Sequence, residues 1–173
     1  MALASRLDGD PYRVFCLLGD GEVQAGQVWE AAMTAGKYRV PGLIAILDYN
    51  KVQLDDFVKN ILDLEPVIAK WQAFGWPVIE IDGHDHGQIA KALDQAEATR
   101  GVPAFIVAHT VKGKGVSFME NNPEWHGKAP KPAEAVTAIR HILGISEPAW
   151  DEYLAAETSA RAIVDELRAL DRK

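Results

Sequence analysis

The chain alternates between short apolar runs and longer segments in which apolar residues recur with a helical period. The first run, Tyr12 to Leu18, ends in Gly-Asp-Gly and predicts a buried strand that leads into a turn. Glu22 to Tyr38 then carries apolar residues at helical spacing until Pro41-Gly42 stops the pattern. A second unbroken apolar run, Leu43 to Leu47, is typical of a parallel strand covered on both faces.

The alternation continues through the middle of the chain. The pattern predicts a helix from about Glu65 to Phe74, a strand over Val78 to Ile81, a helix from about Gly87 to Thr99 and a strand over Ala104 to Ala108. Four strands with helical crossovers make a parallel sheet. The predicted fold class is therefore α/β, with a parallel sheet and helices on both faces.

The two ends are less regular. Met1 to Leu7 has apolar spacing without an N-cap, so it is either the last turns of a longer helix or an ordinary short N-terminal helix. A stretch from His109 to Pro132 has no clear period, and loops of this length inside compact domains are often functional. Two helical patterns follow it, Pro132 to Leu143 and Pro148 to Leu170.

Composition limits the classes of function. At 173 residues, with 48% apolar and 25% charged residues, we expect a single domain over residues 1–173. The net charge of -7 and the scattered Lys and Arg residues argue against nucleic-acid or anionic-membrane partners. Cys16 is the only cysteine, which excludes an intrachain disulfide or a multi-cysteine metal site and fits a reducing cytoplasm. Because no apolar stretch suits a membrane span or signal peptide, we expect a soluble, cytoplasmic protein.

Two polar residues stand at the predicted carboxyl ends of the first two strands. Asp20 lies in Gly19-Asp20-Gly21, and Asn50 follows about 30 residues later, in the position where α/β sheets bind ligands. If the two strands are neighbours, the Asp20 carboxylate and the Asn50 amide oxygen can converge on one hard cation. Magnesium suits such oxygens, and the Val52 carbonyl would supply a third.

The local sequence also favours a phosphate group at this point. Glycines on both sides of Asp20 let a diphosphate approach the backbone, and the helix beginning near Glu22 adds its N-terminal dipole. Two plainer interpretations exist. Asp-Gly between apolar runs is also a hairpin signal, although the helical period of the next segment argues against it. Asn50 taken alone would be a turn-forming asparagine, so the pair carries the prediction.

Gly19-Asp20-Gly21 together with Asn50 resembles the thiamine-diphosphate motif, and the surrounding residues resemble transketolases in particular. The similarity covers essentially the whole chain and is carried by residues 17–22, 27–32, 82–85 and 111–121. Trp125-His126-Gly127 resembles the loop whose histidine reaches the diphosphate and the substrate. From the residues alone, His126 would be a solvated or structural loop histidine, so its catalytic role is implied by the resemblance only.

The resemblance implies a thiamine-diphosphate-binding fold in which Asp20, Asn50 and the Val52 carbonyl hold magnesium. His126 is implied as the catalytic residue that polarises or deprotonates substrate oxygens. The residues implied in cofactor binding are Gly19, Asp20, Gly21, Glu22, Asn50, Leu54, Val111 and His126. The implied reaction moves a two-carbon ketol unit between phosphorylated sugars, with thiamine diphosphate as electron sink.

Transketolases also have parts that do not match any segment of this chain. These parts are an upstream segment with substrate-binding histidines and a second domain that binds the pyrimidine end of the cofactor. We therefore expect a shortened first subunit that works with a pyrimidine-domain subunit, as a homo-oligomer, or both. The alternatives are a related thiamine enzyme, such as deoxyxylulose-phosphate synthase or an oxo-acid dehydrogenase subunit, and a non-catalytic cofactor-binding or assembly fragment.

Overall fold

The computed structural model describes residues 1–170, which divide into two compact units. The first is Met1–Val111, and the second begins at Lys112. Within residues 1–170, no helix combines the length and the apolar character needed to cross a membrane.

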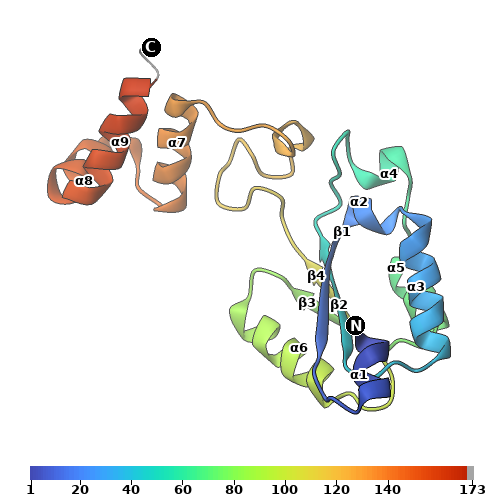
Figure 1. Ribbon diagram of the computed structural model, residues 1–173. Helices are drawn as coiled ribbons and strands as arrows, with labels where there is room; N and C mark the ends of the chain where they lie inside the picture. The colour runs from blue at the N-terminus through green and yellow to red at the C-terminus, as the bar shows by residue number, and fades with distance from the viewer. Residues whose placement is uncertain (171–173) are drawn as a thin grey trace. The chain divides into compact units, whose positions relative to one another are not determined.

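The first unit is built on a four-stranded parallel sheet (Figure 1). The strands are β1 (Val14–Gly19), β2 (Leu43–Tyr49), β3 (Val78–Asp82) and β4 (Ala104–His109), in the spatial order β1-β2-β4-β3. All three pairings are parallel, and Gly19 on β1 lies opposite Asp48 on β2. The predicted parallel α/β sheet is confirmed, and the first two strands are neighbours as the cation-site hypothesis requires.

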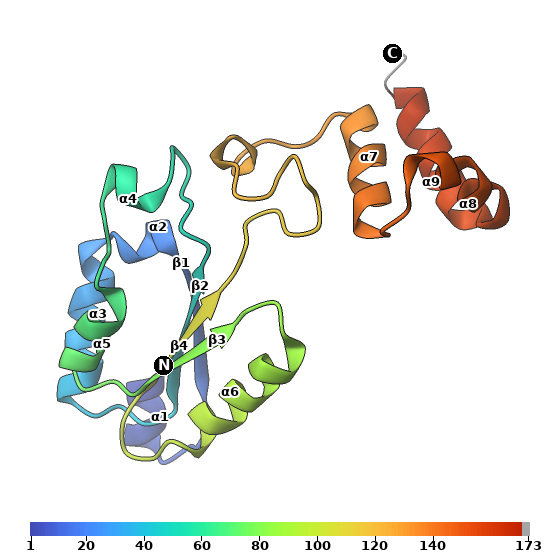
Figure 2. The same cartoon turned by 180° about the vertical axis from the view of Figure 1, so that it is seen from behind.

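The first unit also contains a helix that precedes β1 and the helices that connect its strands. They are α1 (Ala2–Asp8), α2 (Asp20–Val23), α3 (Gly26–Lys37), α4 (Val58–Ile61), α5 (Val67–Ala73) and α6 (His86–Ala98). Figures 1 and 2 show α3 and α5 on one face of the sheet and α6 on the other. Helix α6 begins where Asp85 accepts hydrogen bonds from the backbone N–H groups of Gly87 and Gln88. This cap satisfies two donors that a helix start would leave without partners.

Alternate residues of the central strands pack into two separate cores. Ala45, Leu47 and Phe105 face α3 and α5, where the Trp71 ring stacks on Phe105 with centroids 3.9 Å apart. Ile44 and Ile106 face α6 and pack against its small residues, Ala92 and Ala96. Successive side chains of a strand point to opposite faces of the sheet. Because both faces are covered here, the side chains on each face are buried in a different core, and residues 43–47 and 104–108 are apolar throughout.

Strand β1 departs from its predicted environment. We expected a buried strand, but β1 lies at the edge of the sheet, and the Phe15 and Leu17 side chains are 50% and 70% exposed. An apolar run shows that both faces of a strand suit burial, but it does not show which neighbours cover them. In residues 1–170 β1 pairs only with β2, which leaves half or more of Phe15 and Leu17 exposed.

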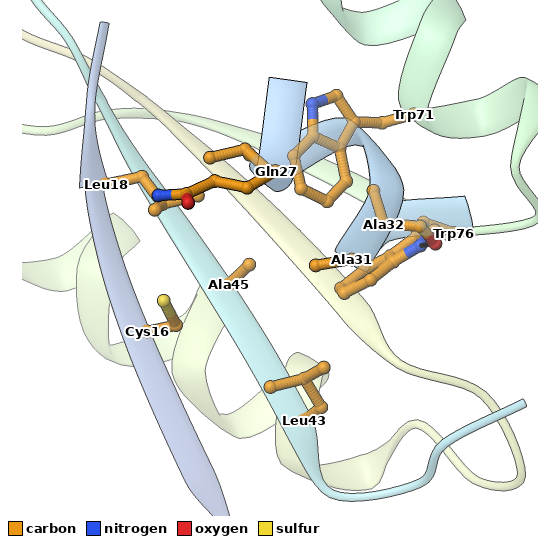
Figure 3. A pocket seen from close by; sticks show the side chains of 10 residues that line it. Cys16, Leu18, Gln27, Ala31, Ala32, Leu43, Ala45, Trp71 and Trp76 are labelled. Carbon is orange, nitrogen blue, oxygen red and sulfur yellow. Dashed lines mark hydrogen bonds between the residues drawn. The ribbon is translucent and has the colours of Figure 1, made fainter. Parts of the chain in front are cut away.

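An apolar hollow lies between β1 and α3 on the other face of β1. Its volume is about 310 Å³. Cys16 and Leu18 line it from the strand, and Ala31 and Ala32 line it from the helix (Figure 3). Trp76 closes another side and donates a hydrogen bond from its indole N–H to the Ala32 carbonyl at 2.9 Å.

Two predicted helices are interrupted. Residues Gln24 and Ala25 separate α2 from α3, where one helix from Glu22 to Tyr38 was expected. In the second unit the predicted helix Pro148–Leu170 is divided at Glu157. A helical period of apolar residues persists across a short turn, so the pattern alone does not locate such breaks.

The second unit is a helical cluster that follows a long loop. Its elements are η1 (Pro123–Trp125), α7 (Pro132–Ile142), η2 (Glu147–Ala149), α8 (Trp150–Ala156) and α9 (Thr158–Leu170). Trp150, Leu154 and Val164 form its small core. The loop prediction for residues 109–132 is confirmed apart from the last residue of β4, the single turn η1 and the start of α7.

Candidate functional site

Asp20 is the central residue of the site. It is the first residue of α2, directly after β1, and only 1% of its surface is exposed. One carboxylate oxygen, Oδ2, accepts a hydrogen bond from the backbone N–H of Lys51. The other oxygen, Oδ1, is buried and has no hydrogen-bond partner among the described residues. A buried carboxylate oxygen without a partner is costly unless another group, such as a cation, binds it.

The surroundings of Asp20 change its acidity. Burial is the largest influence and raises the pKa of the Asp20 carboxyl to about 7. The backbone N–H of Lys51 opposes this rise, while the negative charge of Asp48 adds to it. Without a cation, ionisation of the Asp20 carboxyl is therefore unfavourable. A bound cation would stabilise the ionised carboxylate and remove this penalty.

Asn50 lies in the turn that follows β2, beside Asp20. The Asn50 side chain is buried, and its Oδ1 atom accepts a hydrogen bond from the backbone N–H of Val52 at 2.9 Å. Lys51 has a φ of 65°, the left-handed conformation that lets the chain turn sharply at this point. Within residues 1–170, no backbone N–H donates to the Val52 carbonyl. The turn thus brings Asn50 and Val52 to the same strand ends as Asp20.

The residues on both sides of Asp20 hold the start of α2. Glu22 accepts a hydrogen bond from the Gly19 N–H at 2.7 Å and so caps the helix. A Cβ atom on Gly21 would lie 3.1 Å from the Gln53 Cβ, so α2 packs closely against the turn after β2. Gly21 therefore serves this packing, and Glu22 orders the backbone around Asp20.

The donor set fits a hard divalent cation. Asp20 offers a buried carboxylate oxygen that has no partner in the described part of the chain. Asn50 offers an amide oxygen with a remaining lone pair, and Val52 offers a carbonyl oxygen. Magnesium binds such oxygens and takes its other ligands from water and phosphates. In residues 1–170, no group of three or more His, Cys, Asp or Glu side chains is placed to bind a metal, so a thiolate or imidazole site has no support there.

Leu54 and Val111 are two of the residues that the resemblance implies in cofactor binding. Leu54 follows the turn after β2, and its side chain is 65% exposed. Val111 follows β4, is half-buried and donates its backbone N–H to the Nε2 atom of His84 at 2.7 Å. Leu54 therefore follows the same strand as Asn50, and Val111 follows the strand that lies next to it in the sheet.

His126 belongs to the second unit. It ends the turn η1, is half-buried, and its Nδ1 atom is buried without a hydrogen-bond partner among the described residues. Burial lowers the pKa of the imidazole below its ordinary value, and the positive charge of Lys112 lowers that pKa further. Both influences favour the neutral imidazole, which can accept a proton.

Residues 8–162 match the family model described as "Transketolase, thiamine diphosphate binding domain". The chain belongs to this family. A transketolase from Campylobacter jejuni has the same fold, with a TM-score of 0.74 and 27% identity over 99% of this chain and 28% of that one. The expected resemblance and the thiamine-diphosphate-binding fold are confirmed for this transketolase domain.

Two relatives are subunits of transketolases. The 6-deoxy-6-sulfo-D-fructose transketolase subunit of a Clostridium species is 48% identical over 73% of this chain and 46% of its own length. One subunit of the apulose-4-phosphate transketolase of Actinobacillus succinogenes is 41% identical over 82% of this chain and 51% of its own length. This transketolase domain spans about half the length of these relatives.

Sequence reasoning missed two residues of this transketolase domain. Asp48 and Thr110 lie at the ends of β2 and β4, and the Thr110 hydroxyl donates a hydrogen bond to the Asp48 carboxylate. Asp48 also accepts a hydrogen bond from the side-chain amide of Asn50 at 3.2 Å. Its place two residues before Asn50 was the available signal. The partner Thr110 could not be found this way, because 62 residues separate it from Asp48.

Proposed function

We propose that this chain forms the magnesium-diphosphate half of a transketolase active site. In the assembled enzyme a two-carbon ketol unit would pass from a ketose phosphate to an aldose phosphate. One observation carries the proposal: a buried Asp20 carboxylate has an oxygen without a partner among residues 1–170, beside Asn50, in a domain of a thiamine-diphosphate-binding family.

The cation would be held by the Asp20 carboxylate, the Asn50 amide oxygen and the Val52 carbonyl. Magnesium there would neutralise the charge of a diphosphate, which lies best near the N–H groups at a helix start. Gly19 and Gly21 would lie beside the diphosphate. Gly21 lets α2 pack closely against Gln53, and Glu22 fixes the start of α2 through its hydrogen bond from the Gly19 N–H. Leu54 and Val111 would border the thiamine rings.

His126 would act on the substrate. A neutral imidazole can accept a proton from a sugar hydroxyl and return it later, and the pKa of His126 is lowered by burial and by Lys112 in the direction that keeps it neutral. Thiamine diphosphate, when bound, supplies the electron sink for breaking and forming carbon–carbon bonds. The chain would thus provide cofactor binding, orientation and one proton-transfer group.

The names of the relatives support a sugar substrate and a partner chain. Both relatives are called subunits, and their names refer to a modified fructose and to apulose 4-phosphate. We infer a phosphorylated or similarly anionic sugar for this chain, a partner that supplies the pyrimidine-binding domain, and an oligomeric enzyme. A role in pentose-phosphate metabolism in the cytoplasm fits this class of substrate and the single cysteine.

Calorimetric titration of thiamine diphosphate into the chain, with and without magnesium, tests the site. We expect magnesium-dependent binding that Asp20→Ala abolishes and that Asp94→Asn leaves unchanged, since Asp94 is an exposed residue of α6. Binding that ignores magnesium, or that survives Asp20→Ala, would contradict the assignment.

Turnover by the chain mixed with its partner tests the reaction. Transfer from a ketose phosphate to an aldose phosphate, without consumption of pyruvate, is the expected result. Pyruvate turnover would instead support a deoxyxylulose-phosphate synthase or an oxo-acid dehydrogenase. Cofactor binding without any turnover in the assembled complex would support a non-catalytic assembly fragment.

A further inference from the structure

Asp48 has both carboxylate oxygens engaged at the end of β2. Oδ1 accepts the hydroxyl hydrogen of Thr110, and Oδ2 accepts a hydrogen bond from the Asn50 Nδ2 at 3.2 Å. Asp48 lies opposite Gly19 on β1 and Ala108 on β4, in the middle of the strand ends that carry the site. The carboxylate therefore connects the end of β4 with the side chain of Asn50.

The amide of Asn50 is held by two partners of opposite kind. Its Nδ2 donates to Asp48, and its Oδ1 accepts from the Val52 N–H at 2.9 Å. An ionised carboxylate can only accept and a backbone N–H can only donate, so both partners select the same amide orientation. Turning the amide over would place two acceptors against each other at Asp48 and two donors against each other at Val52.

This orientation has a chemical consequence for a cation ligand. The amide oxygen has two lone pairs, of which the Val52 N–H uses one. An amide NH₂ group has no lone pair for a metal and would repel one. We propose that Asp48, anchored by Thr110, is a positioning residue that keeps the Asn50 oxygen available to magnesium. The inference rests on the proposed function, in which Asn50 is a magnesium ligand.

The test reverses the polarity of the hydrogen bond. In Asp48→Asn, the new side chain can still accept from Thr110, and its NH₂ group then faces Asn50. Asn50 would have to turn over to accept from it, so we expect magnesium affinity, measured by titration at fixed thiamine diphosphate, to fall by about tenfold or more. The control Asp82→Asn alters an exposed aspartate that likewise ends a strand, β3, and should leave the affinity unchanged.

A reciprocal variant separates positioning from a merely structural role. In Asp48→Asn with Asn50→Asp, residue 48 donates and residue 50 accepts, so the pair matches again and residue 50 presents an oxygen. We expect this double variant to bind magnesium about tenfold more tightly than Asp48→Asn alone. Unchanged affinity in Asp48→Asn, or no recovery in the double variant, overturns the proposal.

The orientation has a second readout that needs no cofactor. In a nitrogen-15 NMR spectrum, the side-chain NH₂ signals of Asn50 should move in Asp48→Asn and stay in place in Asp82→Asn. If the unchanged chain does not bind magnesium and thiamine diphosphate, the proposed function fails, yet this spectrum still tests the positioning. If the chemical shifts of the Asn50 NH₂ group are the same in Asp48→Asn and in the unchanged chain, the inference is overturned.

Thr110 provides a variant should Asp48→Asn fail to fold. Thr110→Val removes the hydroxyl that holds the far oxygen of Asp48, while Thr110→Ser keeps it. We expect weaker magnesium binding and shifted Asn50 NH₂ signals in Thr110→Val, with both restored in Thr110→Ser. If Thr110→Val and Thr110→Ser have the same magnesium affinity and the same Asn50 NH₂ signals, the Thr110 hydroxyl does not position Asp48 and the proposal is overturned.

Discussion

The carboxylate of Asp20, at the end of β1, accepts a hydrogen bond from the backbone N–H of Lys51, which is 31 residues further along the chain. This contact joins the first residue of α2 to the turn after β2. It also leaves the second oxygen of Asp20 buried and without a partner among the described residues. The local stability of the site should therefore depend on the charge of Asp20.

The free energy of unfolding of the metal-free chain should depend on the ionisation of Asp20. The pKa of Asp20 is raised by burial from 3.8 to about 7 in the folded chain, so the folded state holds the proton more tightly than the unfolded state. The stabilisation is complete below pH 3.8 and is lost as the pH rises through about 7. The expected loss is on the order of 2–4 kcal/mol.

Urea denaturation in a chelator between about pH 4.5 and 8 measures this effect. Asp20→Asn should flatten the pH dependence and be more stable than the unchanged chain at the alkaline end of this range. Added magnesium should reverse that order, because only the carboxylate binds the cation well. Parallel pH profiles for the two proteins would show that Asp20 is not the responsible group.

His126 should titrate at a lower pH than an ordinary histidine. Burial, with help from the Lys112 charge, lowers its pKa below 6.5. The neutral form is favoured in the fold, so the stabilisation is present above pH 6.5 and is lost as the pH falls through the lowered pKa. An NMR titration of the imidazole should show this, and Lys112→Gln should raise the pKa. An ordinary histidine pKa for His126 that does not change in Lys112→Gln would refute the expectation.

Two glycines of α3 should respond in opposite ways to the same substitution. A Cβ atom on Gly36 would lie 2.0 Å from the Phe74 carbonyl oxygen, whereas one on Gly26 would meet nothing within 4 Å. Gly36→Ala should therefore cost about 1–3 kcal/mol or more in the free energy of unfolding. Gly26→Ala should be neutral or stabilising by up to about 1 kcal/mol. Equal denaturation midpoints would be inconsistent with this close helix contact.

Trp71 should be a main support of the core between the sheet and α3. Its ring is 2% exposed, stacks on Phe105 and meets the Trp76 ring edge-on at 4.9 Å. Trp71→Ala should lower the free energy of unfolding by about 3–5 kcal/mol. Phe15→Ala, at a half-exposed position of β1, should cost clearly less. Thermal denaturation of the two variants gives the comparison.

The exposed edge strand should promote self-association of the isolated chain. Leu17 is 70% exposed on β1, whose outer backbone groups face no strand within residues 1–170. Charged side chains on an edge strand oppose edge-to-edge pairing. Leu17→Lys should therefore reduce the sedimentation-measured association of the chain without lowering its denaturation midpoint. Unchanged association would show that another surface is responsible.

Much of the architecture could be predicted because it follows local patterns. The four strand segments, the helices α3, α5 and α6 and the parallel sheet came from apolar periodicity and from the glycines and prolines that interrupt it, whereas the short helix α4 was not predicted. The candidate pair of Asp20 and Asn50 could be predicted too. Parallel strands place their carboxyl ends at one edge, so two polar residues at those positions must approach each other if the strands are neighbours.

The sequence by itself determined the four strand segments, the main helices between them, and which polar residues follow the first two strand ends. Only the tertiary structure decided that β1 is an edge strand with Phe15 and Leu17 exposed, and that Asp48, Asn50 and Thr110 are joined. The physical reason is that the period of apolar residues shows only which side of its own helix or strand each residue occupies. Strand order and hydrogen bonds between distant residues depend on which elements lie side by side in the folded chain.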